Sequence, residues 1–320
     1  MIFRKLATSL ILAAVALGGC AAVGSRAGSR EATAEAAYPP QGKLLTVNGK
    51  TVHAEVFGSG PDLVLIHGAS GNTRDFTFDL VNRLQDRYRV IVFDRPGLGW
   101  SESLGDDGIS PLAQADQLRA AAALLGAHNP IVLGHSYGGA VAMAWALRDP
   151  GHTAALVIVS GATMPWPGNL GPWYQVTSSR IGGATVIPLI SAFAPMSRAE
   201  DAIDGIFAPD PVPPGYARYV GAGLTLRRAS LRNNAQQVGA LKAHVTLMAP
   251  NYPALRMPVE IVHGTADTIV PASIHAEKLA QLLPDAHLTL LAGAGHMPHH
   301  SRTPDIIAAI DRAANRAGLR

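Results

Sequence analysis

The sequence predicts an α/β fold with a doubly wound, mostly parallel sheet and an inserted helical cap. Short runs rich in Leu and β-branched residues alternate with segments of helical periodicity. This alternation is typical of a parallel sheet with helices on both faces. One long interval, residues 162–257, breaks the alternation. At 320 residues, 48% of them hydrophobic, the chain can bury a large core.

The N-terminus has the pattern of an export signal. Arg4 and Lys5 form a basic start, residues 6–17 are apolar, and Leu17-Gly18-Gly19-Cys20 follows. The apolar stretch is too short to span a bilayer comfortably as a mature helix. A secretory leader cleaved elsewhere and an uncleaved membrane anchor remain alternatives. Cys20 is the only cysteine, which excludes an intrachain disulfide.

The tetrapeptide ending in Cys20 resembles the lipobox of bacterial lipoproteins. The resemblance implies a signal peptide over residues 1–19 and a lipidated N-terminal Cys20. More than one acyl chain makes anchoring durable, because a single chain binds a membrane only marginally. We therefore expect an exported, membrane-anchored protein that faces the periplasm or the cell exterior. Ala21, in place of an aspartate, favours the outer membrane.

A tether and a hairpin are expected next. Residues 20–40 are rich in Ala, Gly, Ser and Arg and lack sustained apolar periodicity, which predicts a flexible tether. Residues 43–47 and 51–57 are β-rich runs on either side of Asn48-Gly49, the strongest short-range signal for a hairpin.

The predicted core comprises residues 41–161 and 258–320. Its strands are expected at 62–66, 89–93, 130–133, 155–159, 259–262 and 287–291, and its helices at 74–86, 112–125, 139–148, 273–283 and 304–314. Residues 162–257 contain a proline cluster and a helix-like stretch at 227–241. A structureless loop of this length would be implausible, so we expect a mainly helical cap, with an independent small domain as the alternative.

Gly134-His135-Ser136-Tyr137-Gly138 matches the motif G-x-S-x-G and lies between a predicted strand and a predicted helix. This context places a strained serine at the carboxyl edge of the sheet, with its hydroxyl exposed. Ser136 is the predicted nucleophile. A serine hydroxyl needs a base to remove its proton, so a histidine is expected within hydrogen-bond reach.

His296 is the best placed histidine, because a glycine-rich loop connects it to the strand over residues 287–291 at the same edge of the sheet. Asp267 follows the strand over residues 259–262 and can fix the tautomer of the base. The rival acid position, after the strand over residues 155–159, holds Ser160-Gly161-Ala162 and offers no carboxylate.

His67-Gly68-Ala69 follows another strand, so the backbone N–H groups of Ala69 and Tyr137 are the predicted oxyanion hole. His67 is expected to brace this loop. The glycines of Asp94-Arg95-Pro96-Gly97-Leu98-Gly99 lack the spacing of dinucleotide and nucleoside-triphosphate loops, so a structural turn is expected there.

These motifs, in this order, resemble the α/β-hydrolase superfamily, and in particular its capped, esterase-like serine hydrolases. The likeness extends from about residue 43 to the C-terminus. It implies hydrolysis through Ser136, Asp267 and His296, in the chain order that the pattern requires, without a metal or a cofactor. Haloalkane dehalogenases and epoxide hydrolases have an aspartate nucleophile where this chain has Ser136.

The expected substrate is a small apolar carboxylic ester. Candidates for its pocket are Trp166, Trp173, Tyr174, Phe207 and Met248. Hydrolysis of carbon–carbon bonds and cofactor-free perhydrolase or haloperoxidase-like activity are the enzymatic alternatives, and a non-catalytic binding lipoprotein is a third. A net charge of +3 without a stripe of Lys and Arg argues against binding to nucleic acid. The sequence predicts no oligomeric state.

Overall fold

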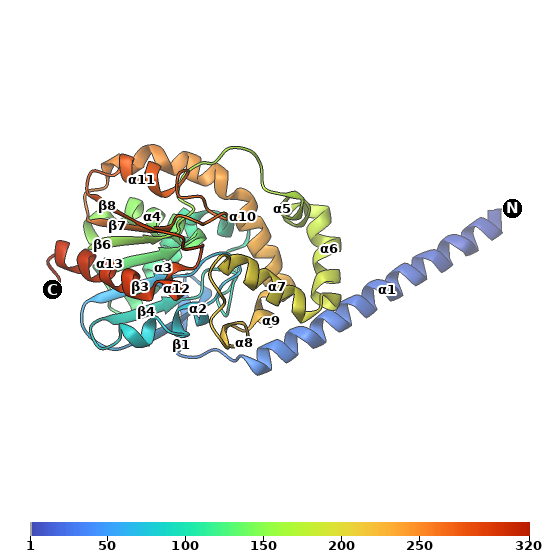
Figure 1. Ribbon diagram of the computed structural model, residues 1–320. Helices are drawn as coiled ribbons and strands as arrows, with labels where there is room; N and C mark the ends of the chain where they lie inside the picture. Colours follow the sequence, from blue (N-terminus) through green and yellow to red (C-terminus); the bar gives the residue numbers. More distant parts are fainter. Residues whose placement is uncertain (1) are drawn as a thin grey trace.

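A computed structural model describes the backbone of residues 2–320 and the side chains from Gly18 onward. Within this part of the chain eight strands form one sheet, in the order β1-β2-β4-β3-β5-β6-β7-β8 (Figure 1). The strands are β1 (Lys43–Val47), β2 (Lys50–Phe57), β3 (Asp62–Ile66), β4 (Arg89–Phe93), β5 (Ile131–His135), β6 (Ala155–Val159), β7 (Val259–Gly264) and β8 (Ala286–Leu291). Strands β3 to β8 are parallel, whereas β2 pairs antiparallel with β1 and β4.

Helices alternate with the strands after β3, which confirms the predicted doubly wound sheet. The helices are α1 (Ile2–Ala37), α2 (Arg74–Thr77), α3 (Pro111–Leu124), α4 (Tyr137–Arg148), α5 (Pro172–Ser178), α6 (Arg180–Phe193), α7 (Met196–Phe207), α8 (Tyr216–Tyr219), α9 (Ala222–Thr225), α10 (Arg228–Met248), α11 (Ala276–Leu282), α12 (Pro298–Ser301) and α13 (Thr303–Arg316). The continuous helix predicted over residues 74–86 is wrong, since the structure has α2 and a second short turn at Val81–Arg83.

The core lies on both faces of the sheet, because successive side chains of a strand point to opposite sides. In β3, Val64 and Ile66 pack on the face that α3 and α4 cover. Leu63 and Leu65 pack on the other face, together with Ile306 and its neighbours in α13. Burial on both faces explains why the inner strands read as continuous apolar runs.

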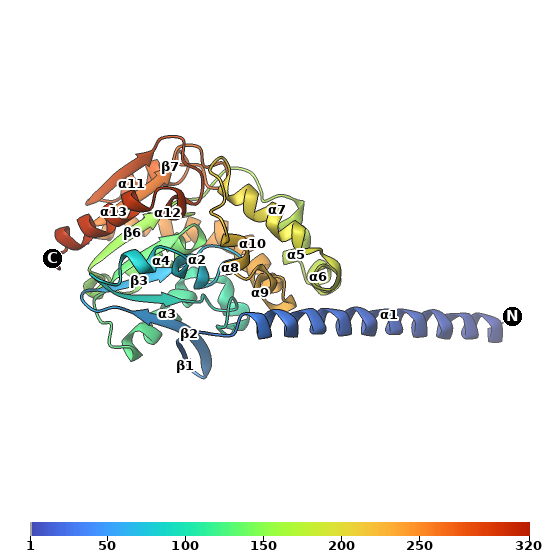
Figure 2. The same ribbon diagram turned by 60° about the horizontal axis from the view of Figure 1, so that its bottom comes forward.

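The cap is inserted between β6 and β7, as the fold prediction requires. Helices α5 to α10 form it and lie beyond one edge of the sheet (Figures 1 and 2). Helix α10, with 21 residues, is the longest of them and packs against both α5 and α6. The cap therefore covers the edge at which the predicted catalytic residues leave their strands.

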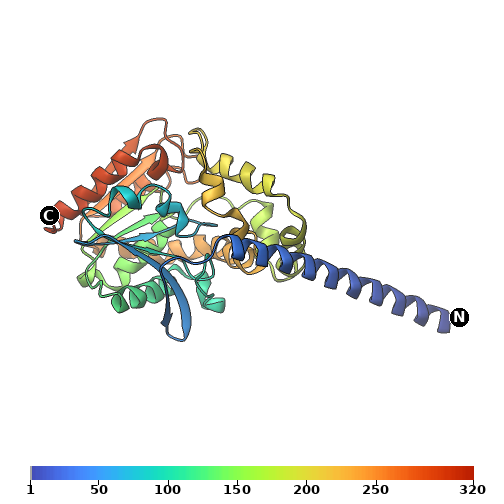
Figure 3. The same cartoon turned by 90° about the horizontal axis from the view of Figure 1, so that it is seen from below.

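The N-terminal segment differs from the predicted tether. Residues 20–37 belong to α1, which packs along α6 and projects from the cap side (Figure 3). Alanine favours helix, and Glu31 accepts hydrogen bonds from Arg228 of the cap at 2.8 Å. Of the predicted leader, residues 1–19, the side chains of residues 1–17 lie outside the described ones. Among the described residues, no helix is both long and apolar enough to span a membrane.

Candidate active site

Ser136 lies in a strained turn between β5 and α4. Its backbone has φ 53° and ψ −119°, a conformation that side chains rarely adopt. A Cβ atom on Gly134 would lie 2.1 Å from the Gly138 carbonyl oxygen, and one on Gly138 would lie 2.1 Å from that of Ile66. Both glycines of the motif are therefore required by close backbone approach, and together they let the turn present Ser136 at the carboxyl edge of the sheet.

The structure brings Ser136, His296 and Asp267 together from three separate strand ends. Ser136 Oγ lies 2.9 Å from His296 Nε2, and His296 Nδ1 lies 2.7 Å from Asp267 Oδ2. All three residues are buried. Because Asp267 accepts a hydrogen bond from Nδ1–H, Nε2 is left as the acceptor that faces the serine hydroxyl.

Asp267 is held in place by its own loop. Its Oδ1 accepts hydrogen bonds from the backbone N–H groups of Ile269 and Val270, both at 2.9 Å. Burial by itself would raise the pKa of Asp267, but hydrogen bonds from His263 and His296 hold it well below its usual range. The carboxylate therefore stays ionised and orients the imidazole.

The loop of His296 is held by contacts from two directions. His135 Nε2 donates to the His296 carbonyl oxygen at 2.9 Å. From the cap, Asp210 Oδ2 accepts the Gly295 N–H at 2.8 Å. The cap therefore positions the predicted base as well as covering it.

The predicted oxyanion loop lies against Ser136, the predicted nucleophile. A Cβ atom on Gly68 would lie 3.1 Å from Ser136 Cβ, so the loop passes very close to the serine. Among the hydrogen bonds of the described residues, the backbone N–H groups of Ala69 and Tyr137 have no protein acceptor. Helix α10 fixes the next residue, since Asn234 Oδ1 accepts the Ser70 N–H at 2.7 Å.

Arg95 is a buried cation beneath this loop, and its own role was not predicted from the sequence. Its guanidinium donates to the carbonyl oxygens of His67 and Gly68 at 2.9 and 3.0 Å and lies 4.2 Å from the centre of the Tyr137 ring. Burial lowers the pKa of Arg95 to about 10. His67 Nε2 in turn accepts a hydrogen bond from the backbone N–H of Arg95, so His67 lies in the bracing position expected for it.

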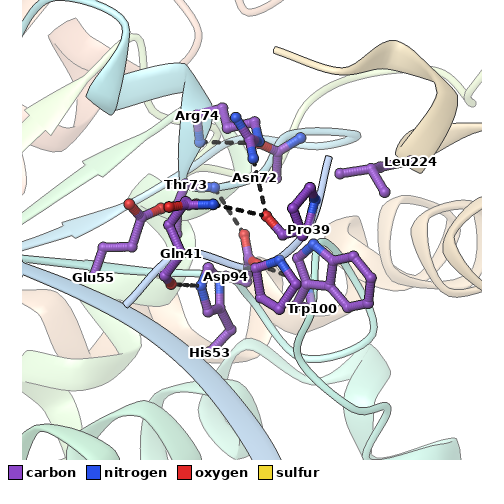
Figure 4. Close-up of a pocket in the computed structure, with 11 residues that line it drawn as sticks. Pro39, Gln41, His53, Glu55, Asn72, Thr73, Arg74, Asp94, Trp100 and Leu224 are labelled. Atoms are coloured by element: carbon purple, nitrogen blue, oxygen red, sulfur yellow. Dashed lines mark hydrogen bonds and ion pairs between the residues drawn. The ribbon is translucent and has the colours of Figure 1, made fainter. Parts of the chain in front are cut away.

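Asp94 organises the turn that follows β4. It accepts hydrogen bonds from the backbone N–H groups of Thr73 and Trp100, both at 2.7 Å, and from His53 Nδ1 at 2.6 Å (Figure 4). Burial would raise the pKa of Asp94, but the His53 hydrogen bond contributes to holding it below the usual value. The glycine-rich segment that begins at Asp94 therefore forms a structural turn, as expected.

A cavity of about 590 Å³ opens beside Ser136 and His296 and reaches under the cap. Of the predicted pocket residues, Trp173, Tyr174 and Phe207 line it. Trp166 and Met248 do not line the cavity, so these two predictions are wrong. Met248 is buried in the core, and Trp166 packs against that core. Much of the remaining lining is aliphatic and includes Ala202, Ile203, Ile206, Val220, Leu231 and Met297.

The sequence did not predict a polar cluster that reaches the cavity wall through Asp75 and Tyr216. Asp75 Oδ1 accepts hydrogen bonds from Tyr216 Oη of the cap at 2.8 Å and from His300 Nε2 at 2.9 Å, and His299 Nε2 lies 3.2 Å away. Burial raises the pKa of Tyr216 well above its usual value, with a contribution from Asp75. The only signal in the sequence was the pair His299-His300, close after the predicted base.

Asp75, His299 and His300 are also the one group, among the residues described, whose donor atoms are close enough to share a metal ion. A histidine that binds a metal through Nε2 normally donates its Nδ1 proton to an acceptor. The buried Nδ1 atoms of His299 and His300 have no such partner in the described structure. The cluster therefore fits a hydrogen-bonded link between core and cap better than a metal centre.

Comparisons with known proteins agree with this architecture. Residues 63–310 match the alpha/beta hydrolase family. The chain is 33% identical over 319 residues to the polyketide synthase ThaQ of Burkholderia thailandensis, covering 93% of this chain but only 15% of that protein's length. It is 29% identical to the pimeloyl-[acyl-carrier protein] methyl ester esterase of Chromobacterium violaceum, covering 80% of this chain and 95% of the relative.

Solved structures share the fold at lower identity. An esterase from Rhodococcus sp. ECU1013 has a TM-score of 0.66 at 22% identity, covering 85% of this chain and 97% of its own. The enol-lactonase of Burkholderia xenovorans has a TM-score of 0.69 at 18% identity, covering 85% and 100%. From the family match, the sheet and the inserted helices, we conclude that this chain belongs to the alpha/beta hydrolase family.

Proposed function

We propose that the protein is a serine esterase that hydrolyses small apolar carboxylic esters through an acyl-enzyme on Ser136. The observation that carries the proposal is the continuous hydrogen-bonded line from Ser136 Oγ through His296 to Asp267, at 2.9 and 2.7 Å. A strained serine next to an oriented imidazole is the arrangement that activates a hydroxyl as a nucleophile.

In the first half of the reaction, Ser136 Oγ attacks the ester carbonyl carbon and its proton passes to His296 Nε2. The carbonyl oxygen becomes an oxyanion, and the N–H groups of Ala69 and Tyr137 bind it. When the bond to the alcohol oxygen breaks, His296 returns the proton to the departing alcohol. The acyl group is left on Ser136.

In the second half, His296 takes a proton from water, and the resulting hydroxide adds to the acyl carbon. Collapse of this intermediate breaks the bond to Ser136 Oγ, which recovers the proton from His296. Asp267 stays ionised throughout and stabilises the imidazolium. The products are an acid and an alcohol.

Arg95 supports the oxyanion hole without touching the substrate. Its Nη2 donates to the Gly68 carbonyl oxygen, and the same peptide group carries the N–H of Ala69. A hydrogen bond to the oxygen of an amide polarises its N–H group and strengthens it as a donor. Arg95 is therefore a positioning residue.

The cavity supports the assignment of an apolar acyl group, because its lining is mostly aliphatic and aromatic. The relatives named as methyl ester esterases support an ester as the bond that is cleaved. We also propose that the protein is exported and anchored to a membrane through acyl chains on Cys20. Mass spectrometry of the mature N-terminal peptide tests the anchor, with Cys20→Ala as the control.

Labelling with a fluorophosphonate probe tests the nucleophile. Wild-type protein should be labelled and Ser136→Ala should not, whereas Ser160→Ala, which replaces another buried serine at a strand end, should label like wild type. Equal labelling of Ser136→Ala would refute the assignment. A panel of esters of graded acyl length then defines the substrate. Diketone-like substrates and peroxide with acetate, added to the same panel, test the other reactions that this triad supports.

A further inference from the structure

The outer helices of the cap expose a group of large apolar side chains. Six of them follow one another along α5, α6 and the start of α7, with exposed fractions between 44% and 79%. We call this group the apolar cap face: Trp173, Val176, Ile181, Leu189, Phe193 and Met196. Helices α5 and α6 pack against each other, and large apolar residues exposed on adjoining helices indicate a surface that meets an apolar partner.

The charge of this segment favours a lipid surface as the partner. Between residues 172 and 198 the sequence contains no Asp, Glu, Lys or His, and its charged residues are Arg180 and Arg198; the exposed acidic residues of α7 begin at Glu200, after the last residue of the apolar cap face. Both arginines are exposed. Apolar side chains flanked by cationic ones have the composition that binds the interface of a membrane containing anionic lipids.

Helix α1 leads the predicted anchor to the same side of the molecule. Arg26 Nε donates to the Ala192 carbonyl oxygen at 2.8 Å, and Ala27 is fully buried, so α1 is packed against the end of α6. Cys20 lies six residues before Arg26 in the same helix, which corresponds to about 9 Å along its axis. In Figures 2 and 3, α1 leaves the molecule on the cap side.

The cavity connects this surface to the nucleophile. Trp173 belongs to the apolar cap face and also lines the cavity that contains Ser136. Ile190 and Ala194, which lie on and directly after α6, line the cavity as well. An ester that leaves a bilayer beside α5 and α6 would therefore meet the cavity without crossing the core.

We propose that the apolar cap face docks on an anionic phospholipid surface and that the enzyme takes ester substrates from that surface. This inference rests on the proposed esterase activity and on the proposed anchor at Cys20. Acyl chains on Cys20 hold the protein at the membrane, and the apolar cap face sets its orientation, with the entrance to the cavity against the lipid. The anchor and the docking surface then act as two membrane signals.

Quenching of tryptophan fluorescence tests the orientation without using activity. The full-length protein, processed and purified from a bacterial membrane, is reconstituted into phosphatidylcholine–phosphatidylglycerol vesicles with or without brominated acyl chains. Brominated lipid should quench the wild-type protein, and the quenched component should be absent in Trp173→Phe, since Trp173 is the most exposed tryptophan described and Trp145 is buried. Absent quenching, or equal quenching of both proteins, would overturn the docking.

A pair of double variants tests the route of the substrate. Ile181→Ser with Leu189→Ser alters the apolar cap face, and Leu124→Ser with Leu247→Ser alters other exposed leucines outside that face. For an ester dissolved in the vesicle bilayer, the first pair should lower kcat/KM about ten-fold. Both pairs should leave turnover of a short water-soluble ester unchanged. Equal turnover of the bilayer ester by all proteins would overturn the proposed route.

The outcomes separate the proposals. If the wild type hydrolyses no ester, the esterase assignment fails, while quenching of Trp173 still reports docking. If Cys20→Ala prevents attachment but the wild type shows no quenching, the anchor stands and the docking fails. If sedimentation without vesicles shows a dimer that Ile181→Ser with Leu189→Ser dissociates, and lipid does not quench Trp173, the apolar cap face is a self-association surface and the proposal is wrong.

Discussion

Replacing Asp267 with asparagine should lower kcat about 10⁴-fold and leave the fold nearly unchanged. The reason lies in the two sides of the carboxylate. Its Oδ1 accepts two backbone N–H groups, those of Ile269 and Val270, whereas Oδ2 accepts Nδ1–H of His296. Only one orientation of an asparagine amide keeps the first pair of hydrogen bonds.

In that orientation the amide oxygen takes the place of Oδ1, and the NH₂ group faces His296 Nδ1. Two donors cannot face one another, so the imidazole adopts the tautomer with its proton on Nε2. Nε2 then donates to Ser136 Oγ and cannot accept the hydroxyl proton. A loss of 10⁴-fold corresponds to about 5.5 kcal/mol of transition-state stabilisation.

Steady-state turnover of a chromogenic ester measures this effect, and urea unfolding followed by circular dichroism checks the fold. Asp106→Asn, a change at an exposed carboxylate, serves as the matched control. Asp267→Ala should lose both activity and stability, because the two backbone N–H groups then lack their acceptor. If Asp267→Asn kept more than about a tenth of the activity, with an unchanged unfolding midpoint, the tautomer argument would be refuted.

Three further outcomes are expected. Arg95→Met leaves buried carbonyl oxygens without their donor, so the free energy of unfolding should fall by about 3 kcal/mol in urea titrations and kcat should fall more than KM rises. Tyr216→Phe removes the hydrogen bond to the Asp75 carboxylate and should cost about 2 kcal/mol by the same measurement; an unchanged midpoint would exclude a link between core and cap. Burial lowers the pKa of His67 from 6.5 to about 4, so as pH falls His67 is protonated in the unfolded chain before it is protonated in the folded protein. The free energy of unfolding should therefore decrease by about 3 kcal/mol from this group between pH 6.5 and 4, and His67→Gln should flatten that slope.

The N-terminal segment shows a limit of sequence patterns. Residues 20–40 lack an apolar stripe, which predicted a flexible tether, yet α1 extends to Ala37. Its contacts with the cap include polar ones, between Arg26 and the Ala192 carbonyl oxygen and between Glu31 and Arg228. Hydrophobic periodicity does not report such partners, because they lie more than 160 residues away in the chain.

The cavity shows a second limit. Composition indicated aromatic residues in the cap, but Trp166 and Met248 turned out to pack with the core rather than the cavity. Which side chains of the insertion face a cavity depends on how its loops and helices pack against the sheet. Asp75 and its histidine partners were missed for a similar reason, since more than 220 residues separate them in the chain.

The sequence by itself determined the strand–helix alternation, the serine turn, and the placement of Ser136, Asp267 and His296 after separate strands. It could do so because strand burial and the glycines of a tight turn are local requirements, and parallel strands bring their carboxyl ends to one edge. The tertiary structure alone decided the 2.7 and 2.9 Å contacts, the support from Arg95 and the lining of the cavity. Those features depend on how distant elements pack, and no local pattern of residues encodes that packing.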